Sequence, residues 1–139
     1  MVRIEIKSAE YKIVNAVNDL ILYTTELGDE VACSFFSLKL KKVALARNID
    51  GNQLKQLINE LNPNNLLDLG LIRVQLIGGE AGSTTSLEYL RQIIETLKIV
   101  DNNHNIINII SCDTSERLHP NSFEIDCYHG GIRNLALSF

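Results

Sequence analysis

The sequence predicts an α+β fold, a layered sandwich of mostly antiparallel strands with two helices on one side. Two segments repeat apolar residues at helical spacing, and several others alternate or run apolar over a strand's length. Turn residues, many of them Asn and Gly, separate these segments. No internal repeat, low-complexity segment or linker interrupts the order, so we expect residues 1–139 to form a single domain.

Composition and charge argue against several classes of protein. The chain is 45% hydrophobic and 22% charged, as in ordinary globular proteins. A net charge of −4 and the lack of a Lys/Arg stripe argue against nucleic-acid binding. No apolar run reaches about 18 residues, so no membrane span is expected. The charged N-terminal stretch lacks a signal-peptide core and the three cysteines are scattered, which predicts a cytoplasmic protein with reduced thiols.

The first third of the chain has the patterns of strands. Val2–Ile6 alternates apolar and polar residues, and residues 20–24 form a short run of β-favouring types. Residues 26–29 supply a turn that contains a glycine, and residues 31–38 form the next strand. Residues 38–47 are expected to be the hairpin partner of that strand, with three lysines crowding the turn.

Two helices and four more strands follow. Apolar residues at i, i+3, i+4 and i+7 predict one helix over residues 51–61 and another from about 85 to 98. Pro63 ends the first helix, and Thr85 with Glu88 suggests a capping box for the second. The expected strands are residues 71–77, the isoleucine-rich residues 105–111, buried on both faces, and a hairpin made of residues 122–128 and 132–137.

Local motifs by themselves carry little chemistry. The Gly78–Gly82 run is not a phosphate-binding loop, since no Lys-Ser/Thr follows, and it favours a tight turn. Cys33 shares a strand face with Val31 and Phe35, which favours a core thiol over a nucleophile. Cys127 and His129 lie two residues apart on one strand face, but that spacing does not guarantee a hydrogen bond. The other histidines, His104 and His119, also lack metal-ligand spacing, so no metal and no cofactor are expected.

The order of the pieces resembles the CheD family, the glutamine deamidases that modify chemoreceptors in bacterial chemotaxis. Ile21-Leu22-Tyr23-Thr24 matches the family's first strand, (I/V)-L-x-T. Leu27-Gly28 and Val31-Ala32 fit the frame of its L-G-S-C-V-A motif without a gap. Residues 42–47 are similar to the hairpin return that ends in the family's histidine, and Leu76-Ile77-Gly78-Gly79 to its F-G-G strand end. The parallels continue at Gly82, Thr85, Asp113 and Gly130-Gly131 and cover nearly the whole chain, with a minority of identical positions.

The resemblance implies a site whose chemistry has been lost. In that family a cysteine thiolate, paired with a histidine and supported by a threonine, attacks the carboxamide of a receptor glutamine. Thr24 matches the family's threonine, but Glu30 stands at the position of the cysteine and Arg47 at that of the histidine. The resemblance also implies that Gly78-Gly79 borders the pocket. A carboxylate is a poor nucleophile towards an amide, and a guanidinium does not act as a base.

We therefore expect a catalytically degenerate CheD-like protein that binds a protein partner, either a receptor-like helix or a signalling protein. Glu30 and Arg47 are expected to form an ion pair that reproduces the charges of a thiolate and an imidazolium. One alternative is a working deamidase or amidohydrolase in which Cys33 is the nucleophile, supported by Thr24 or a histidine of the C-terminal half. Another is an unrelated α+β interaction module.

Overall fold

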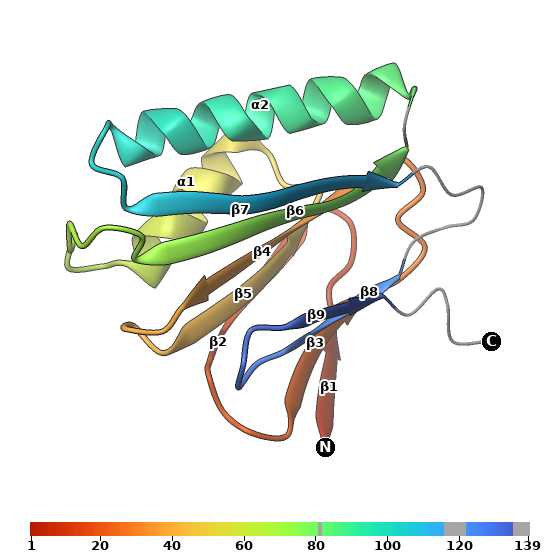
Figure 1. The fold of residues 1–139 in the computed structure, drawn as a ribbon. Helices are drawn as coiled ribbons and strands as arrows, with labels where there is room; N and C mark the ends of the chain where they lie inside the picture. The colour runs from red at the N-terminus through yellow and green to blue at the C-terminus, as the bar shows by residue number, and fades with distance from the viewer. Residues whose placement is uncertain (81, 116–121, 135–139) are drawn as a thin grey trace.

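The computed structural model describes residues 1–80, 82–115 and 122–134, and it has three layers (Figure 1). A pair of helices lies on one face of a five-stranded sheet, and a four-stranded sheet lies on the other. The elements in chain order are β1 (Val2–Glu5), β2 (Glu10–Asn15), β3 (Leu20–Thr24), β4 (Val31–Ser37), β5 (Lys42–Arg47), α1 (Gly51–Leu61), β6 (Ile72–Glu80), α2 (Thr84–Asp101), β7 (Ile107–Ser115), β8 (Phe123–Asp126) and β9 (Ile132–Asn134).

The sheet topology confirms the expected fold class. The large sheet has the order β2-β5-β4-β6-β7, and the small sheet has the order β1-β3-β8-β9. Within the described residues, β1–β3 and β6–β7 pair in parallel, and the other five pairs of neighbouring strands are antiparallel. The protein is therefore an α+β sandwich of mostly antiparallel strands with both helices on one side.

Two hydrophobic cores hold the layers together, and the large sheet contributes to both. The first core lies between the helices and the sheet, where Phe35, Leu57 and Leu97 are at most 1% exposed. The second lies between the two sheets and contains Leu22 and Ile125, each also at most 1% exposed. The strands β4 and β5 are covered on both faces, which explains their nearly continuous apolar sequences.

The first helix has the bounds predicted from sequence, whereas the start of the second differs. Asp50 caps α1, and its carboxylate and the Gln53 side chain each bond the other's backbone N–H. The cap of α2 is Ser83, whose hydroxyl accepts a hydrogen bond from the backbone of Ser86. The expected Thr85–Glu88 capping box is therefore wrong, because Thr85 already lies inside the helix and Glu88 pairs with Arg91.

The expectation for the isoleucine-rich strand is also wrong. The strand β7 is an edge strand of the large sheet, with Asn108 exposed and Ile110 42% exposed. Ile107 and Ile109 pack against the helix-side core, so one face is covered. Apolar content alone does not show whether both faces of a strand are covered or only one. The strand β2 was not predicted, because its alternation of Tyr11 and Ile13 with polar residues is short.

The described part of the chain contains no helix that is both long and apolar enough to cross a bilayer.

Candidate functional site

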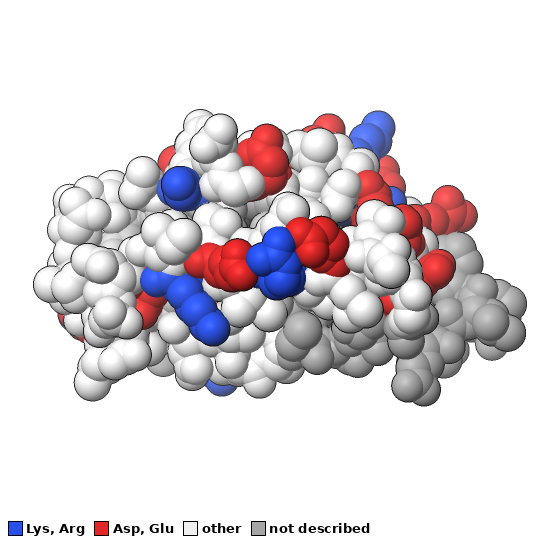
Figure 2. All heavy atoms as spheres, turned by 90° about the horizontal axis from the view of Figure 1, so that it is seen from above, with Lys and Arg blue, Asp and Glu red and all other residues white. Residues whose placement is uncertain are grey.

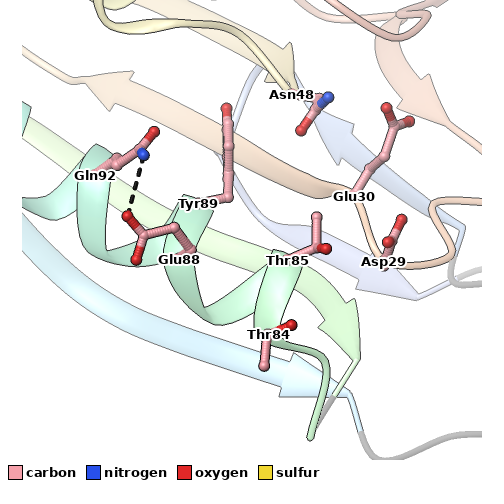
Figure 3. Close-up of a pocket in the computed structure, with 8 residues that line it drawn as sticks. All are labelled: Asp29, Glu30, Asn48, Thr84, Thr85, Glu88, Tyr89 and Gln92. Carbon is pink, nitrogen blue, oxygen red and sulfur yellow. Dashed lines mark hydrogen bonds between the residues drawn. The ribbon is translucent and has the colours of Figure 1, made fainter.

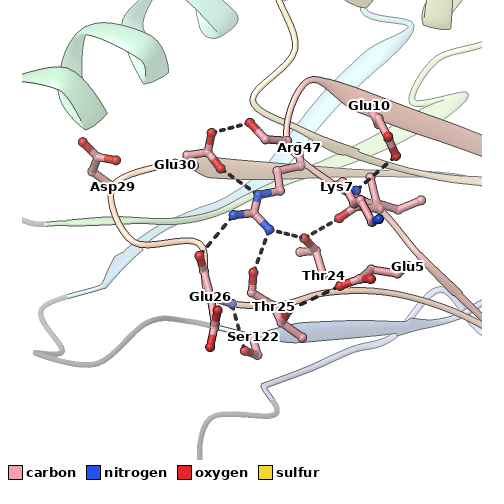
Figure 4. Close-up of polar contacts among 12 residues, drawn as sticks. Glu5, Lys7, Glu10, Thr24, Thr25, Glu26, Asp29, Glu30, Arg47 and Ser122 are labelled. Carbon is pink, nitrogen blue, oxygen red and sulfur yellow. Dashed lines mark hydrogen bonds and ion pairs between the residues drawn. The ribbon is translucent and has the colours of Figure 1, made fainter.

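The structure brings Thr24, Glu30 and Arg47 together at one end of the sandwich (Figure 4). Thr24 is the last residue of β3, Glu30 precedes β4, and Arg47 is the last residue of β5. Because β4 and β5 pair with Ala32 opposite Arg47, the hairpin register carries the guanidinium to the start of β4. The expected ion pair is present, with 2.8 Å between Arg47 Nε and Glu30 Oε1.

Arg47 uses all three nitrogens of its guanidinium. Besides the bond from Nε to Glu30, Nη1 donates to the hydroxyl of Thr24 at 3.1 Å and to the carbonyl of Thr25 at 2.6 Å. Nη2 donates to the carbonyl of Glu26 at 3.1 Å. A planar fork of N–H donors suits such divergent acceptors. The side chains of Arg47 and Glu30 are 14% and 23% exposed, so the pair is partly withdrawn from water.

Thr24 and Glu30 also bond to the segment that joins β1 to β2. The buried Thr24 hydroxyl donates to the carbonyl of Ile6 at 2.7 Å, and Ser8 donates to Glu30 Oε2 at 2.5 Å. The threonine therefore holds a structural hydrogen bond in addition to the one from Arg47. Sequence reasoning missed both Ile6 and Ser8, since nothing local in the chain links them to residues some twenty positions away.

Gly78 and Gly79 contact the β3–β4 turn, and they do not line the open cleft that lies beside the ion pair. Both are buried, with φ values of +93° and +77° that disfavour other residues. The Gly79 amide donates to the carbonyl of Glu30 at 2.9 Å, and a Cβ at Gly78 would stand 2.6 Å from Leu27. Both glycines belong to the end of β6 and hold the β3–β4 turn in place, whereas the resemblance implied that they border the pocket.

Cys33 and Cys127 lie in different cores. Cys33 is 1% exposed and packs in the helix-side core with Val31 and Phe35, as the alternation of its strand predicts. Cys127 is fully buried in the other core, and burial raises the pKa of its thiol to about 11. His129 is 71% exposed and bonds Asp126 through Nδ1 at 3.1 Å. Cys127 lies in the core and His129 in solvent, so these two side chains do not form a catalytic dyad.

An open cleft of about 680 Å³ lies beside the ion pair, between the β3–β4 turn and the first turns of α2 (Figure 3). It is lined by Asp29, Glu30, Asn48, Thr84, Thr85, Glu88, Tyr89 and Gln92. Three of these residues are acidic, three carry hydroxyls and two carry amides. Such a lining offers many hydrogen bonds and contains no cysteine or histidine.

Ser86 and Tyr89 fix the walls of this cleft and were not singled out from sequence. The buried Ser86 hydroxyl donates to the carbonyl of Asp29 at 2.6 Å and accepts from the amide of Glu80 at 3.0 Å. The Tyr89 hydroxyl donates to the carbonyl of Ile49 at 2.6 Å, and burial raises its pKa well above the usual value. A serine at a core position of an apolar helix stripe was the available signal for Ser86.

In the described ranges, no three or more His, Cys, Asp and Glu side chains are grouped as a metal site would need. His104 is exposed near the C-terminal end of α2, and His119 lies outside the described residues.

No protein-family model matches the chain. It is 50% identical over 70 residues to the uncharacterized protein RC0132 of Rickettsia conorii. The aligned segment makes up 50% of this chain and 92% of the Rickettsia protein. The chain therefore belongs to the same family as this Rickettsia protein.

Proposed function

We propose that the protein is a catalytically degenerate CheD-like domain that acts by binding a protein partner, such as a receptor-like helix or a signalling protein. The observation that supports this proposal is the ion pair of Glu30 with Arg47, at the two positions where the resemblance puts the catalytic cysteine and histidine. The pair keeps one negative and one positive charge side by side, as a thiolate and an imidazolium would be. It supplies neither a soft nucleophile nor a proton shuttle.

All three nitrogens of the Arg47 guanidinium donate hydrogen bonds within the protein, which supports a structural role for Glu30 and Arg47. Its donors are directed to Glu30, Thr24 and two backbone carbonyls, so the guanidinium is bonded within the protein. The cleft beside it stays open and polar. A cleft kept in shape by a fixed ion pair suits recognition of a partner segment without turnover. A cytoplasmic location is part of this proposal, supported by the scattered cysteines of the sequence.

The competing proposal, a relocated Cys33 nucleophile, predicts a reactive thiol. We expect the opposite: at pH 7.5 iodoacetamide should alkylate Cys33 and Cys127 on the order of a hundredfold more slowly in the native protein than in urea, because both are buried. Labelling of Cys127 should accelerate as the pH approaches its pKa of about 11. Site-resolved mass spectrometry separates the cysteines, and rapid native labelling of Cys33 at neutral pH would favour the enzyme.

Partner binding is tested by placing a photocrosslinking amino acid at Gln92, which lines the cleft, and at Asn108, which is exposed on β7. We expect a defined protein adduct from Gln92 and none from Asn108 in cells that express the full chain. The captured partner should show no conversion of glutamine to glutamate when mixed with the purified protein. Equal adducts from both positions would contradict the binding site, and conversion of glutamine would contradict the loss of catalysis.

A further inference from the structure

At the end of the molecule opposite the cleft, two connections expose leucine side chains. The turn between β4 and β5 carries Leu38, which is 77% exposed, and the connection between α1 and β6 carries Leu67 and Leu69, which are 59% and 80% exposed. An ion pair between Lys39 and Asp68 joins the two connections. Figure 1 shows both at the same end of the sandwich, away from the start of α2. We call this region the leucine–lysine tip and define it as residues 38–42 and 66–69.

Water-exposed leucines at this density call for an explanation. Single apolar residues on a surface are normal, but neighbouring large apolar side chains mark sites of interaction. Leu38, Leu67 and Leu69 are each more than half exposed. The core does not require them, because each lies in a connection outside the regular elements.

The tip is also locally basic in an acidic protein. Lys39, Lys41 and Lys42 lie within four residues of one another, and Asp68 is the single acidic residue of the tip. The whole chain has a net charge of −4. Acidic side chains gather instead towards the opposite end, where α2 begins, as Figure 2 shows from the helix side. Lys39 and Lys41 are both exposed; Lys39 pairs with Asp68, and the charge of Lys41 is available to a partner.

We propose that the leucine–lysine tip binds the surface of an anionic lipid bilayer. The leucines enter the interface while the lysines stay at the headgroups, where each cation is attracted by the negative surface potential. Exposed leucines beside lysines are the combination that suits insertion among anionic headgroups. The tip and the cleft lie at opposite ends, so binding to the bilayer leaves the cleft open to a protein partner.

The test is co-sedimentation of the full chain with vesicles of phosphatidylcholine alone and with one third phosphatidylglycerol. We expect binding to the anionic vesicles that weakens as salt is raised. The double variant Leu38→Ser/Leu69→Ser should lower the partition coefficient about tenfold or more, because burying an exposed leucine supplies much of the binding free energy. Leu87→Ser is the matched control, since Leu87 is 52% exposed on α2 near the opposite end, and it should change nothing.

The lysines are tested separately. Lys39→Gln and Lys41→Gln should each weaken binding to anionic vesicles about fivefold, whereas Lys55→Gln on the exposed side of α1 should have no effect. Thermal melts verify that all variants stay folded. Equal binding by the leucine variants and the parent, or no binding to either vesicle, would overturn the proposal. So would a dimer in solution that the leucine variants dissociate, since the tip would then be a contact between two copies.

Discussion

Arg47→Ala is expected to lower the free energy of unfolding by about 3 kcal/mol, measured by urea denaturation. The substitution removes the partner of the partly buried Glu30 and leaves the carbonyls of Thr25 and Glu26 without their donor. We take the lower end of the range for a broken buried pair, because Glu30 is still 23% exposed and water can reach it. Arg73→Ala is the matched control, since Arg73 is exposed on β6, and its effect should stay within about 0.5 kcal/mol.

Equal effects of the two substitutions would contradict a stabilising role for the Glu30–Arg47 pair. Arg47→Lys sharpens the test, because it keeps the charge but loses the fork of donors. We expect it to recover less than half of the lost stability, since one ammonium cannot reach Glu30 and the two carbonyls together. Full recovery by lysine would mean that charge alone, without geometry, holds these segments.

Gly78→Ala is expected to lower the free energy of unfolding, measured by urea denaturation, by about 4 kcal/mol, more than any other glycine-to-alanine substitution near the site. The loss combines backbone strain at positive φ with overpacking. At φ +93° an alanine is strained, and its Cβ would stand 2.6 Å from a methyl group of Leu27 and 3.2 Å from the carbonyl oxygen of Glu30. Leu27 is 2% exposed, so it has little room to move. The β3–β4 turn and the residues that it presents to the cleft should be displaced.

Gly82→Ala provides the control for this prediction. Gly82 has a similar φ of +83°, but nothing lies within 4 Å of the position that a Cβ would take. Its substitution should cost only the backbone strain, about 1–2 kcal/mol. The difference between the two variants measures the close approach of β6 to the β3–β4 turn, and equal losses would show that this approach does not matter for stability.

Several elements could be predicted from the sequence because their signals are local. The helix α1 begins after Asp50 and ends before Pro63, and its apolar residues keep helical spacing between them, so the sequence contains both its ends and its buried face. The strand β3 was likewise predicted with its observed bounds, residues 20–24. The start of α2 was misplaced because Ser83, Thr84 and Thr85 are all acceptable caps, and local preference does not choose among them.

The site was predicted in part. The proximity of Glu30 and Arg47 was expected from the resemblance, and the antiparallel register of β4 and β5 provides it. The roles of Ser8 and Ile6 could not be predicted, because they depend on the parallel pairing of β1 with β3. The contacts of Gly78-Gly79 could not be predicted for a similar reason, since the sequence did not show which neighbour needs their small size.

The sequence by itself determined which segments form helices and strands, β2 excepted, which face of most of them is apolar, and which residues stand at the positions that matter to the proposed site. The tertiary structure alone decided what covers each face. It put β7 at an edge and surrounded Arg47 with acceptors from separate segments. The physical reason is that periodicity within a segment records its own burial preference, whereas strand order and hydrogen-bond partners arise only when distant segments compete for the same neighbours.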